Sequence, residues 1–106
     1  MPRPFKQRRI RGNPNSSYFK PAGIRVIDLE ESILNLDEFE AIRLIDIDEI
    51  PQKKAAEKMK ISQPTLSRIL SSGRKKIADA IVNGKAIKII KDKNYRDLKW
   101  KEVYFS

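Results

Sequence analysis

The residues best suited to recognise another molecule form a short run of hydrogen-bonding side chains after Ile61. A glutamine can pair bidentately with the edge of adenine and an arginine with that of guanine, whereas a proline offers only an apolar contact, for example to a thymine methyl group. These side chains have the chemistry needed to read bases in a DNA major groove. The residues expected to do so are Ser62, Gln63, Pro64, Thr65, Ser67 and Arg68.

Two short helices joined by a tight turn are predicted to position this run, over residues 52–70. Each helix has one apolar face, because residues three or four apart lie on the same side. These faces are Ala55, Ala56 and Met59 in the first helix and Leu66, Ile69 and Leu70 in the second. Between them Ile61 is an apolar plug and Ser62 a good N-cap. The pattern predicts a helix-turn-helix, in which small alanines permit close helix crossing. An ordinary helical hairpin is the alternative.

The second helix is predicted to continue to about Val82, where Asn83-Gly84 supplies a left-handed stop. Its apolar stripe comprises Leu66, Leu70, Gly73, Ile77 and Ile81. Gly73 should cost about 1 kcal/mol relative to alanine, and it allows either a close helix contact or a bend. Basic residues opposite the stripe are expected to contact DNA phosphates, with help from the positive end of the first helix. The expected phosphate contacts are Gln52, Lys53, Arg74, Lys75 and Lys76.

Residues 1–23 are expected to form an extended basic arm, because four prolines prevent a regular helix there. Such arms reach phosphates or a narrow minor groove in other helix-turn-helix modules. The basic residues expected to do this are Arg3, Lys6, Arg8, Arg9 and Arg11. A basic tail without defined contacts is the alternative.

The remaining elements belong to a domain expected over residues 24–91. Three β-like runs, at residues 24–29, 32–36 and 85–91, predict a small sheet. Asp37 with Glu40 resembles a capping box that opens a helix, with Phe39, Ile42 and Ile45 on its inner face. Pro51 is predicted to start the next helix. The aromatic extension at 92–106 alternates like a strand or a partner surface.

Charge is segregated along the chain, whose formal net charge is +9. Residues 1–25 hold seven basic and no acidic side chains, residues 26–57 hold three basic and ten acidic, and residues 58–106 hold thirteen basic and four acidic. A basic arm and a basic recognition helix with acidic surface turned away favour a polyanionic partner. A solvated, lysine-rich surface is the alternative reading of charge alone.

Several classes of protein are disfavoured by composition. Cysteine and histidine are absent, which removes zinc sites, imidazole-activated nucleophiles and most general bases that work near neutral pH. The carboxylates Asp46, Asp48 and Glu49 lack the spacing of a calcium loop. No apolar run is long enough to span a bilayer, and the basic N-terminus lacks an apolar signal core. We therefore expect a cytoplasmic protein that is not an enzyme, has no cofactor or metal and does not bind membranes.

A family resemblance follows from longer blocks of sequence. Across about residues 2–90, with DEFEAIRL, KKAAEKM and NGKA as its specific blocks, the chain resembles uncharacterised protein family 0251 (domain of unknown function 134). The core of that family is similar to the promoter-reading fourth region of sigma factors, so the resemblance implies DNA binding. Lys60 stands where related motifs commonly have glycine, so a left-handed backbone there would store about 1 kcal/mol of strain. Gln7 stands where some relatives carry cysteine, so no metal role transfers, and the extension from Asp92 lies outside the shared pattern.

The sequence as a whole predicts a mainly α, sigma region-4-like helix-turn-helix of three helices with a small β element and a basic arm. The expected function is noncatalytic, sequence-specific binding of double-stranded DNA, in transcription regulation. One alternative is an interaction module that docks on the transcription machinery through the acidic face and the aromatic extension. Another is a nonspecific nucleic-acid-coating protein. A homodimer is expected, with residues 85–91 and 100–105 as candidate contacts, because such modules usually read two half-sites.

Overall fold

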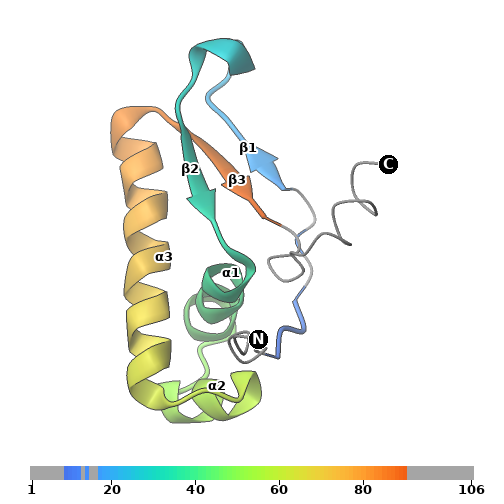
Figure 1. Ribbon diagram of the computed structural model, residues 1–106, viewed down its shortest axis with the longest axis vertical. Coiled ribbons are helices and arrows are strands. Elements are labelled where there is room, and N and C mark those ends of the chain that lie inside the picture. The colour runs from blue at the N-terminus through green and yellow to red at the C-terminus, as the bar shows by residue number, and fades with distance from the viewer. Residues whose placement is uncertain (1–8, 13, 15–16, 91–106) are drawn as a thin grey trace, which may run out of the picture.

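The computed structural model describes residues 9–12, 14 and 17–90, and this part is mainly helical with a small sheet. In chain order its elements are β1 (Tyr18–Phe19), a 3-10 helix η1 (Val26–Asp28), β2 (Glu31–Leu34), α1 (Leu36–Ile42), a π-helix η2 (Arg43–Ile47), α2 (Gln52–Met59), α3 (Gln63–Asn83) and β3 (Ala86–Ile89). Figure 1 shows α3 running along the molecule, from α2 at one end to the sheet at the other, with α1 beside it.

The sheet has three strands in the order β1-β3-β2. β3 pairs antiparallel with β1, placing Phe19 opposite Ile87, and parallel with β2, placing Leu34 opposite Ile89. A parallel pair needs a long crossover, and here the crossover contains all three α-helices. The predictions of a strand at β2 and at β3 are confirmed, although β2 ends at Leu34. Because both edges of β3 are paired, its backbone is not available to a second copy of the chain.

The strand predicted over residues 24–29 is wrong. This segment forms a loop and the short η1, and Val26 and Ile27 are exposed. β-branched residues favour strands only where a neighbouring strand and a buried face are present, and these residues have neither. The second partner of β3 is instead Tyr18–Phe19, within the segment that was expected to be an arm.

The helix predicted to open at Asp37 begins earlier. Asn35 precedes its first turn, and the Glu38 carboxylate accepts a hydrogen bond of 2.8 Å from the Asn35 backbone N–H, which is the return half of a capping box. Asp37 and Glu40 are therefore not the capping pair. Ala41 and Leu44 are the fully buried hydrophobic residues here, and the half-buried Ile42 and Ile45 pack against the same core, as predicted. Phe39 is also half-buried. Ala41 was not predicted as a core residue, because its side chain is small and only weakly hydrophobic.

The main core lies between α1 with η2, α2 and the first half of α3. It consists of Ala41, Leu44, Ala55, Ala56, Met59, Leu66 and Leu70. The inner faces predicted for residues 52–70 are confirmed, with Ile69 half-buried beside the core. The apolar stripe predicted along α3 is confirmed as far as Ile77. Its last member, Ile81, is 73% exposed, and Ala80 is buried instead. Fifteen residues at 3.6 per turn leave Ile81 about 60° away from Leu66 around the helix axis.

Gly73 marks a close approach of α3 to α1 rather than a bend. A Cβ atom at this position would lie 3.0 Å from the Glu38 Cβ and 3.0 Å from the Ile42 Cδ1. The absence of a side chain thus lets the two helices meet. At the far end of α3, Gly84 adopts φ 66° and closes the helix as predicted.

Candidate nucleic-acid interface

The turn between α2 and α3 is held by its own backbone. Lys60 adopts the left-handed conformation, with φ 59° and ψ 47°, and its N–H bonds to the Glu57 carbonyl at 3.1 Å. The Ile61 N–H bonds to the Ala56 carbonyl at 3.0 Å, and its side chain packs against the core. The predicted left-handed residue at Lys60 is therefore present, with its strain of about 1 kcal/mol.

Ser62 caps α3 as predicted. Its hydroxyl oxygen accepts a bond of 3.2 Å from the Thr65 backbone N–H and donates one of 2.8 Å to the Thr65 hydroxyl. Both side chains are thus occupied with each other, and Thr65 is half-buried. Of the residues expected to read bases, these two contribute chiefly by fixing the first turn of the helix.

The other expected base readers are exposed on the first two turns of α3. They are Gln63, Pro64, Ser67 and Arg68. Within the described part of the chain, the side chains of Gln63, Ser67 and Arg68 have no hydrogen bond or ion pair. The opposite face of these turns holds Leu66 and Leu70, which are 0% and 2% exposed. The structure therefore presents available polar groups on a helix that is fixed by its buried side.

The expected phosphate contacts fall into two groups. Gln52 and Lys53, at the start of α2, and Lys75, on α3, are exposed and lack a hydrogen bond or ion pair within the described residues. Arg74, by contrast, forms two hydrogen bonds to Asp46, one of them 3.1 Å from Nε, which raise the pKa of Arg74 and lower that of Asp46. Lys76 lies 2.9 Å from the buried Glu38 carboxylate.

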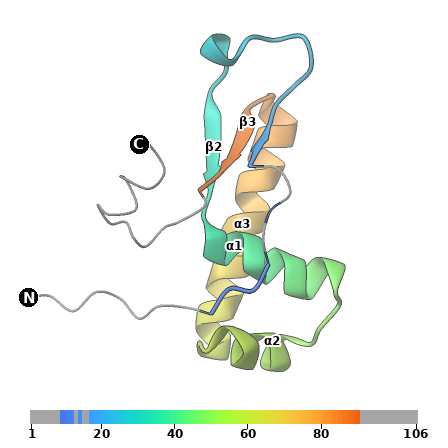
Figure 2. The ribbon, with the colours of Figure 1, turned by 90° about the vertical axis from the view of Figure 1, so that its right-hand side faces the viewer.

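Arg9 and Arg11 are exposed, whereas Arg3, Lys6 and Arg8 lie outside the described residues. The backbone near Arg9 is fixed, because its N–H bonds to the Met59 carbonyl at 3.2 Å. The N–H groups of Arg11 and Gly12 bond to the Glu40 carboxylate at 3.1 and 2.9 Å. Figure 2 shows this blue segment passing α1 and reaching α2. This role of Glu40 could not be predicted from the sequence, because its two backbone partners are 28 and 29 residues away.

The acidic corner after α1 is largely paired with arginines. Asp46 bonds to Arg74, and Asp48 lies 3.2 Å from Arg43. In the described ranges no group of histidine, cysteine, aspartate or glutamate is arranged to hold a metal ion. The helices in the same part of the chain include none that is long and apolar enough to cross a membrane.

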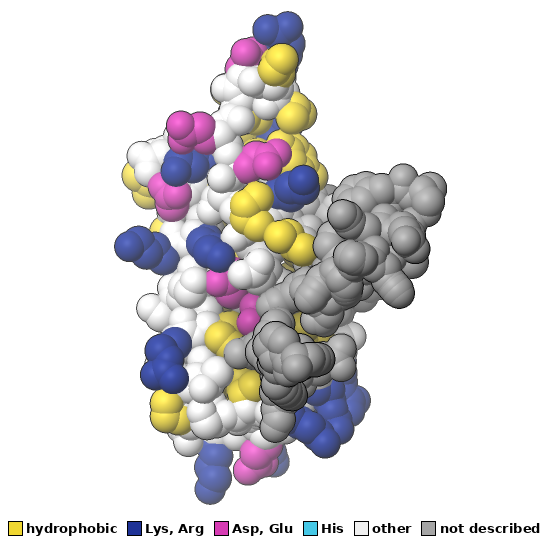
Figure 3. Space-filling model, viewed as in Figure 1, with side chains coloured by type: hydrophobic (Ala, Val, Ile, Leu, Met, Phe, Trp, Pro, Cys, Tyr) yellow, Lys and Arg dark blue, Asp and Glu magenta, His cyan; other side chains and the backbone are white. Residues whose placement is uncertain are grey.

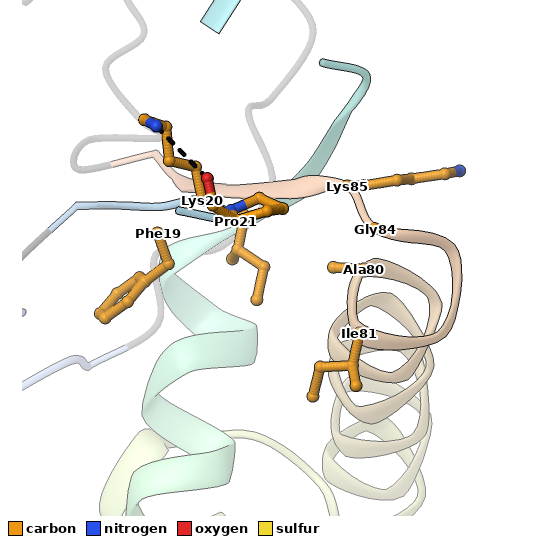
Figure 4. A pocket seen from close by; sticks show the side chains of 8 residues that line it. Phe19, Lys20, Pro21, Ala80, Ile81, Gly84 and Lys85 are labelled. Carbon is orange, nitrogen blue, oxygen red and sulfur yellow. Dashed lines mark hydrogen bonds between the residues drawn. The ribbon is translucent and has the colours of Figure 1, made fainter. Parts of the chain in front are cut away.

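The sheet end of the molecule differs from the α2 end in its surface. Figure 3 shows hydrophobic side chains exposed near the sheet, whereas basic side chains are spread over both ends of this face. Phe19, Ile81 and Val82 are 52%, 73% and 78% exposed. An open hollow of about 340 Å³ lies between β1 and the end of α3, and Figure 4 shows Phe19, Pro21 and Ile81 around it. The aromatic extension at 92–106 lies outside the described residues.

Proteins that resemble this chain include several named UPF0251 proteins. One, of Caldanaerobacter subterraneus subsp. tengcongensis, is 55% identical over 89 residues, which cover 84% of this chain and 75% of that protein. Another, of Dehalococcoides mccartyi strain BAV1, is 52% identical over 89 residues, covering 84% and 76%. A third, of Pelotomaculum thermopropionicum, is 46% identical over 89 residues, covering 84% and 67%. No solved structure matches the chain. The family model "Protein of unknown function DUF134" matches residues 1–98, and the chain belongs to this family.

Proposed function

We propose that this protein binds double-stranded DNA sequence-specifically and regulates transcription, with α2 and α3 acting as a sigma region-4-like helix-turn-helix. The observation that carries the proposal is the unpaired polar surface at the start of α3. Gln63, Ser67 and Arg68 are exposed without a partner among the described residues, on the turns whose other face is the core. These side chains are therefore both available for hydrogen bonding and held at fixed positions by the buried side of the helix.

A surface helix with these side chains is suited to a DNA major groove. The groove admits one α-helix, and the N-terminal residues of a recognition helix contact base edges. Gln63 is suited to adenine and Arg68 to guanine, while Pro64 can contact a thymine methyl. Because Leu66 and Leu70 are buried, only side chains and not the helix itself must be ordered on binding.

Phosphate contacts on either side would fix the register of the helix in the groove. The first turn of α2 has free backbone N–H groups, since the first hydrogen bond to Pro51 comes from Ala55. Gln52 and Lys53 lie on that turn, and Lys75 lies further along α3. These three side chains are available, so we assign them the positioning role in preference to Arg74 and Lys76, which are paired with carboxylates.

Selection of preferred sequences from a pool of random duplexes, using the full chain, tests the proposal. We expect one motif to be enriched. Arg68→Ala and Gln63→Ala should each weaken binding to that motif by about 1–3 kcal/mol while leaving nonspecific binding nearly unchanged. Arg68→Lys is the matched control for charge, because it keeps the positive charge but loses the planar guanidinium that forms the bidentate pair. A pool that stays random after selection would refute sequence-specific binding.

A second candidate function is supported by the apolar surface at the sheet end. Exposed hydrophobic groups such as Ile81 and Val82 favour a protein contact, consistent with an interaction module that docks on the transcription machinery. Salt separates the two functions. Binding by phosphate neutralisation weakens steeply with salt, whereas an apolar interface does not. A nonspecific coating protein would instead show the steep salt dependence without sequence preference.

A further inference from the structure

The Glu40 carboxylate is buried, at 2% exposed, and its two oxygens accept four hydrogen bonds. Two come from Arg43, at 3.1 Å from Nε and 2.9 Å from Nη2. The other two come from the backbone N–H groups of Arg11 and Gly12. Bonds to an ionised acceptor are roughly twice as strong as neutral ones. A charge on α1 therefore holds the backbone of a segment near the start of the chain.

Glycine at position 12 leaves room for this contact. A Cβ atom there would collide with the Arg43 Nε and lie 2.8 Å from the Glu40 Oε1. Arg43 and Glu40 would both have to shift to admit it, and Arg43 would move relative to Asp48, to which it bonds at 3.2 Å. A side chain at position 12 would therefore weaken the approach of this segment to α1.

The contact fixes where the basic N-terminal segment meets the rest of the molecule. Three residues before Gly12, the Arg9 N–H bonds to the carbonyl of Met59, the last residue of α2. Met59 is followed by the turn at Lys60, which sets the direction of α3. Arg9 therefore lies beside the turn that sets the direction of α3, and the side chains of Arg9 and Arg11 are exposed.

We propose that Glu40 is a positioning residue for DNA binding, which clasps the backbone at Arg11 and Gly12 so that the exposed Arg9 and Arg11 and the start of α3 contact one duplex together. This inference rests on the proposed function and deepens it. Because the clasp holds its backbone, this segment forms one surface with the start of α3 and does not have to be positioned separately on the DNA. Less conformational entropy is then lost when its basic residues bind.

Binding to the selected duplex as a function of salt tests the clasp. In the full chain, Glu40→Gln and Gly12→Ala should each weaken affinity by roughly tenfold for each lost phosphate contact at ~0.1 M salt, and lower the slope of log affinity against log salt by about 0.9 per contact. In the full chain carrying Arg9→Ala and Arg11→Ala, Glu40→Gln should have no further effect on DNA affinity. Asp48→Asn is the matched control, because it removes another partner of Arg43 but touches neither clasped N–H group. An equal loss with and without the two arginines would overturn the proposal, as would no loss when both arginines are present.

Amide hydrogen exchange, followed by NMR without DNA, separates failure of the clasp from failure of the proposed function. The N–H groups of Arg11 and Gly12 should be protected in the unaltered protein and should exchange at least tenfold faster in Glu40→Gln, while Leu66 and Leu70 stay protected. Unprotected N–H groups in a protein that does bind DNA would refute the clasp alone. Protected N–H groups in a protein that binds no duplex would refute the proposed function, and with it any positioning role.

Discussion

The two halves of α3 use their outward polar side chains in different ways. Before Gly73, Gln63, Ser67 and Arg68 are exposed and lack a partner within the described residues. After Gly73 the polar side chains are mostly engaged. Arg74 bonds to Asp46, Lys76 to Glu38, and Asp79 to both Asn83 and Lys85. One helix thus combines a surface available for recognition with a surface that fastens it to α1, to η2 and to Lys85, the residue before β3.

This difference shows that the sign of a charge does not reveal its availability. Lys75 and Lys76 are adjacent and chemically identical, yet Lys75 is exposed while the Lys76 Nζ lies 2.9 Å from a carboxylate that is 6% exposed. Moving Lys76 to a phosphate would leave Glu38 buried with one partner fewer. A buried charge without its partner is costly, so Lys76 is held in place. Lys75 interacts with Asp79 only through charge and forms no ion pair with it, so Lys75 is available to bind a phosphate.

The largest effect should come from removing the buried anchor of the second half. Glu38 accepts bonds from the Asn35 N–H, the Ser72 hydroxyl and Lys76. We expect Glu38→Ala to lower the free energy of unfolding by about 2–4 kcal/mol, because the helix cap is lost and Lys76 is left half-buried without its partner. Urea unfolding measures this. A decrease in the free energy of unfolding of less than about 0.5 kcal/mol would show that Glu38 does not anchor the second half of α3.

The neighbouring lysines should respond oppositely. Lys75→Ala should lower the salt slope of DNA binding by about 0.9 and leave stability nearly unchanged. Lys76→Ala should leave the slope unchanged and lower the free energy of unfolding by about 1 kcal/mol, since Lys76 is one-third exposed and its ion pair is partly screened. Each variant is the control for the other. If both variants lowered the salt slope of DNA binding equally, Lys76 would be as available to phosphates as Lys75.

The turn that orients the first half should tolerate relief of its strain. Lys60 has φ 59°, so Lys60→Gly should raise the free energy of unfolding by up to about 1 kcal/mol, reduced by the greater freedom of glycine in the unfolded chain. The preferred DNA motif should not change. Lys58→Gly, inside α2, is the matched control and should destabilise by about 1 kcal/mol. A loss of stability in both variants would contradict the left-handed turn.

The smallest effect should be a difference in acid sensitivity. Burial raises the pKa of Glu40, but the bonds from Arg43 and from the N–H groups of Arg11 and Gly12 outweigh it and lower the pKa below its usual 4.5. The Arg74 hydrogen bond similarly lowers the pKa of Asp46. A lowered pKa contributes stability above the unfolded value, and this is lost as pH falls through the folded value.

Thermal unfolding between about pH 6 and pH 3 measures this dependence. The midpoint should fall below about pH 5, and the fall should be smaller in Glu40→Gln, which has no charge to lose at that position. The same fall in Glu40→Gln as in the unaltered protein would show that Glu40 is not responsible.

The sequence was sufficient where signals are local. The N-cap at Ser62, the stop at Gly84 and the inner faces of residues 52–70 were all predicted correctly, because each depends on side chains within a few positions of one another. It failed at the start of α1 and at residues 24–29. At the start of α1, both Asn35 with Glu38 and Asp37 with Glu40 have the spacing of a capping box, and the structure uses the first pair. At residues 24–29, the β-branched side chains predicted a strand, but no neighbouring strand pairs with them.

The sequence by itself thus determined the turn, the two caps of α3 and the face of α3 that carries Gln63 and Arg68. Only the tertiary structure decided which charges remain available. Glu38 meets Lys76 across 38 positions, and Asp46 meets Arg74 across 28. The clasp at Glu40 and the pairing of Phe19 with β3 are likewise long-range. Helical periodicity links residues three or four apart, whereas contacts between distant segments depend on how the helices and strands pack together.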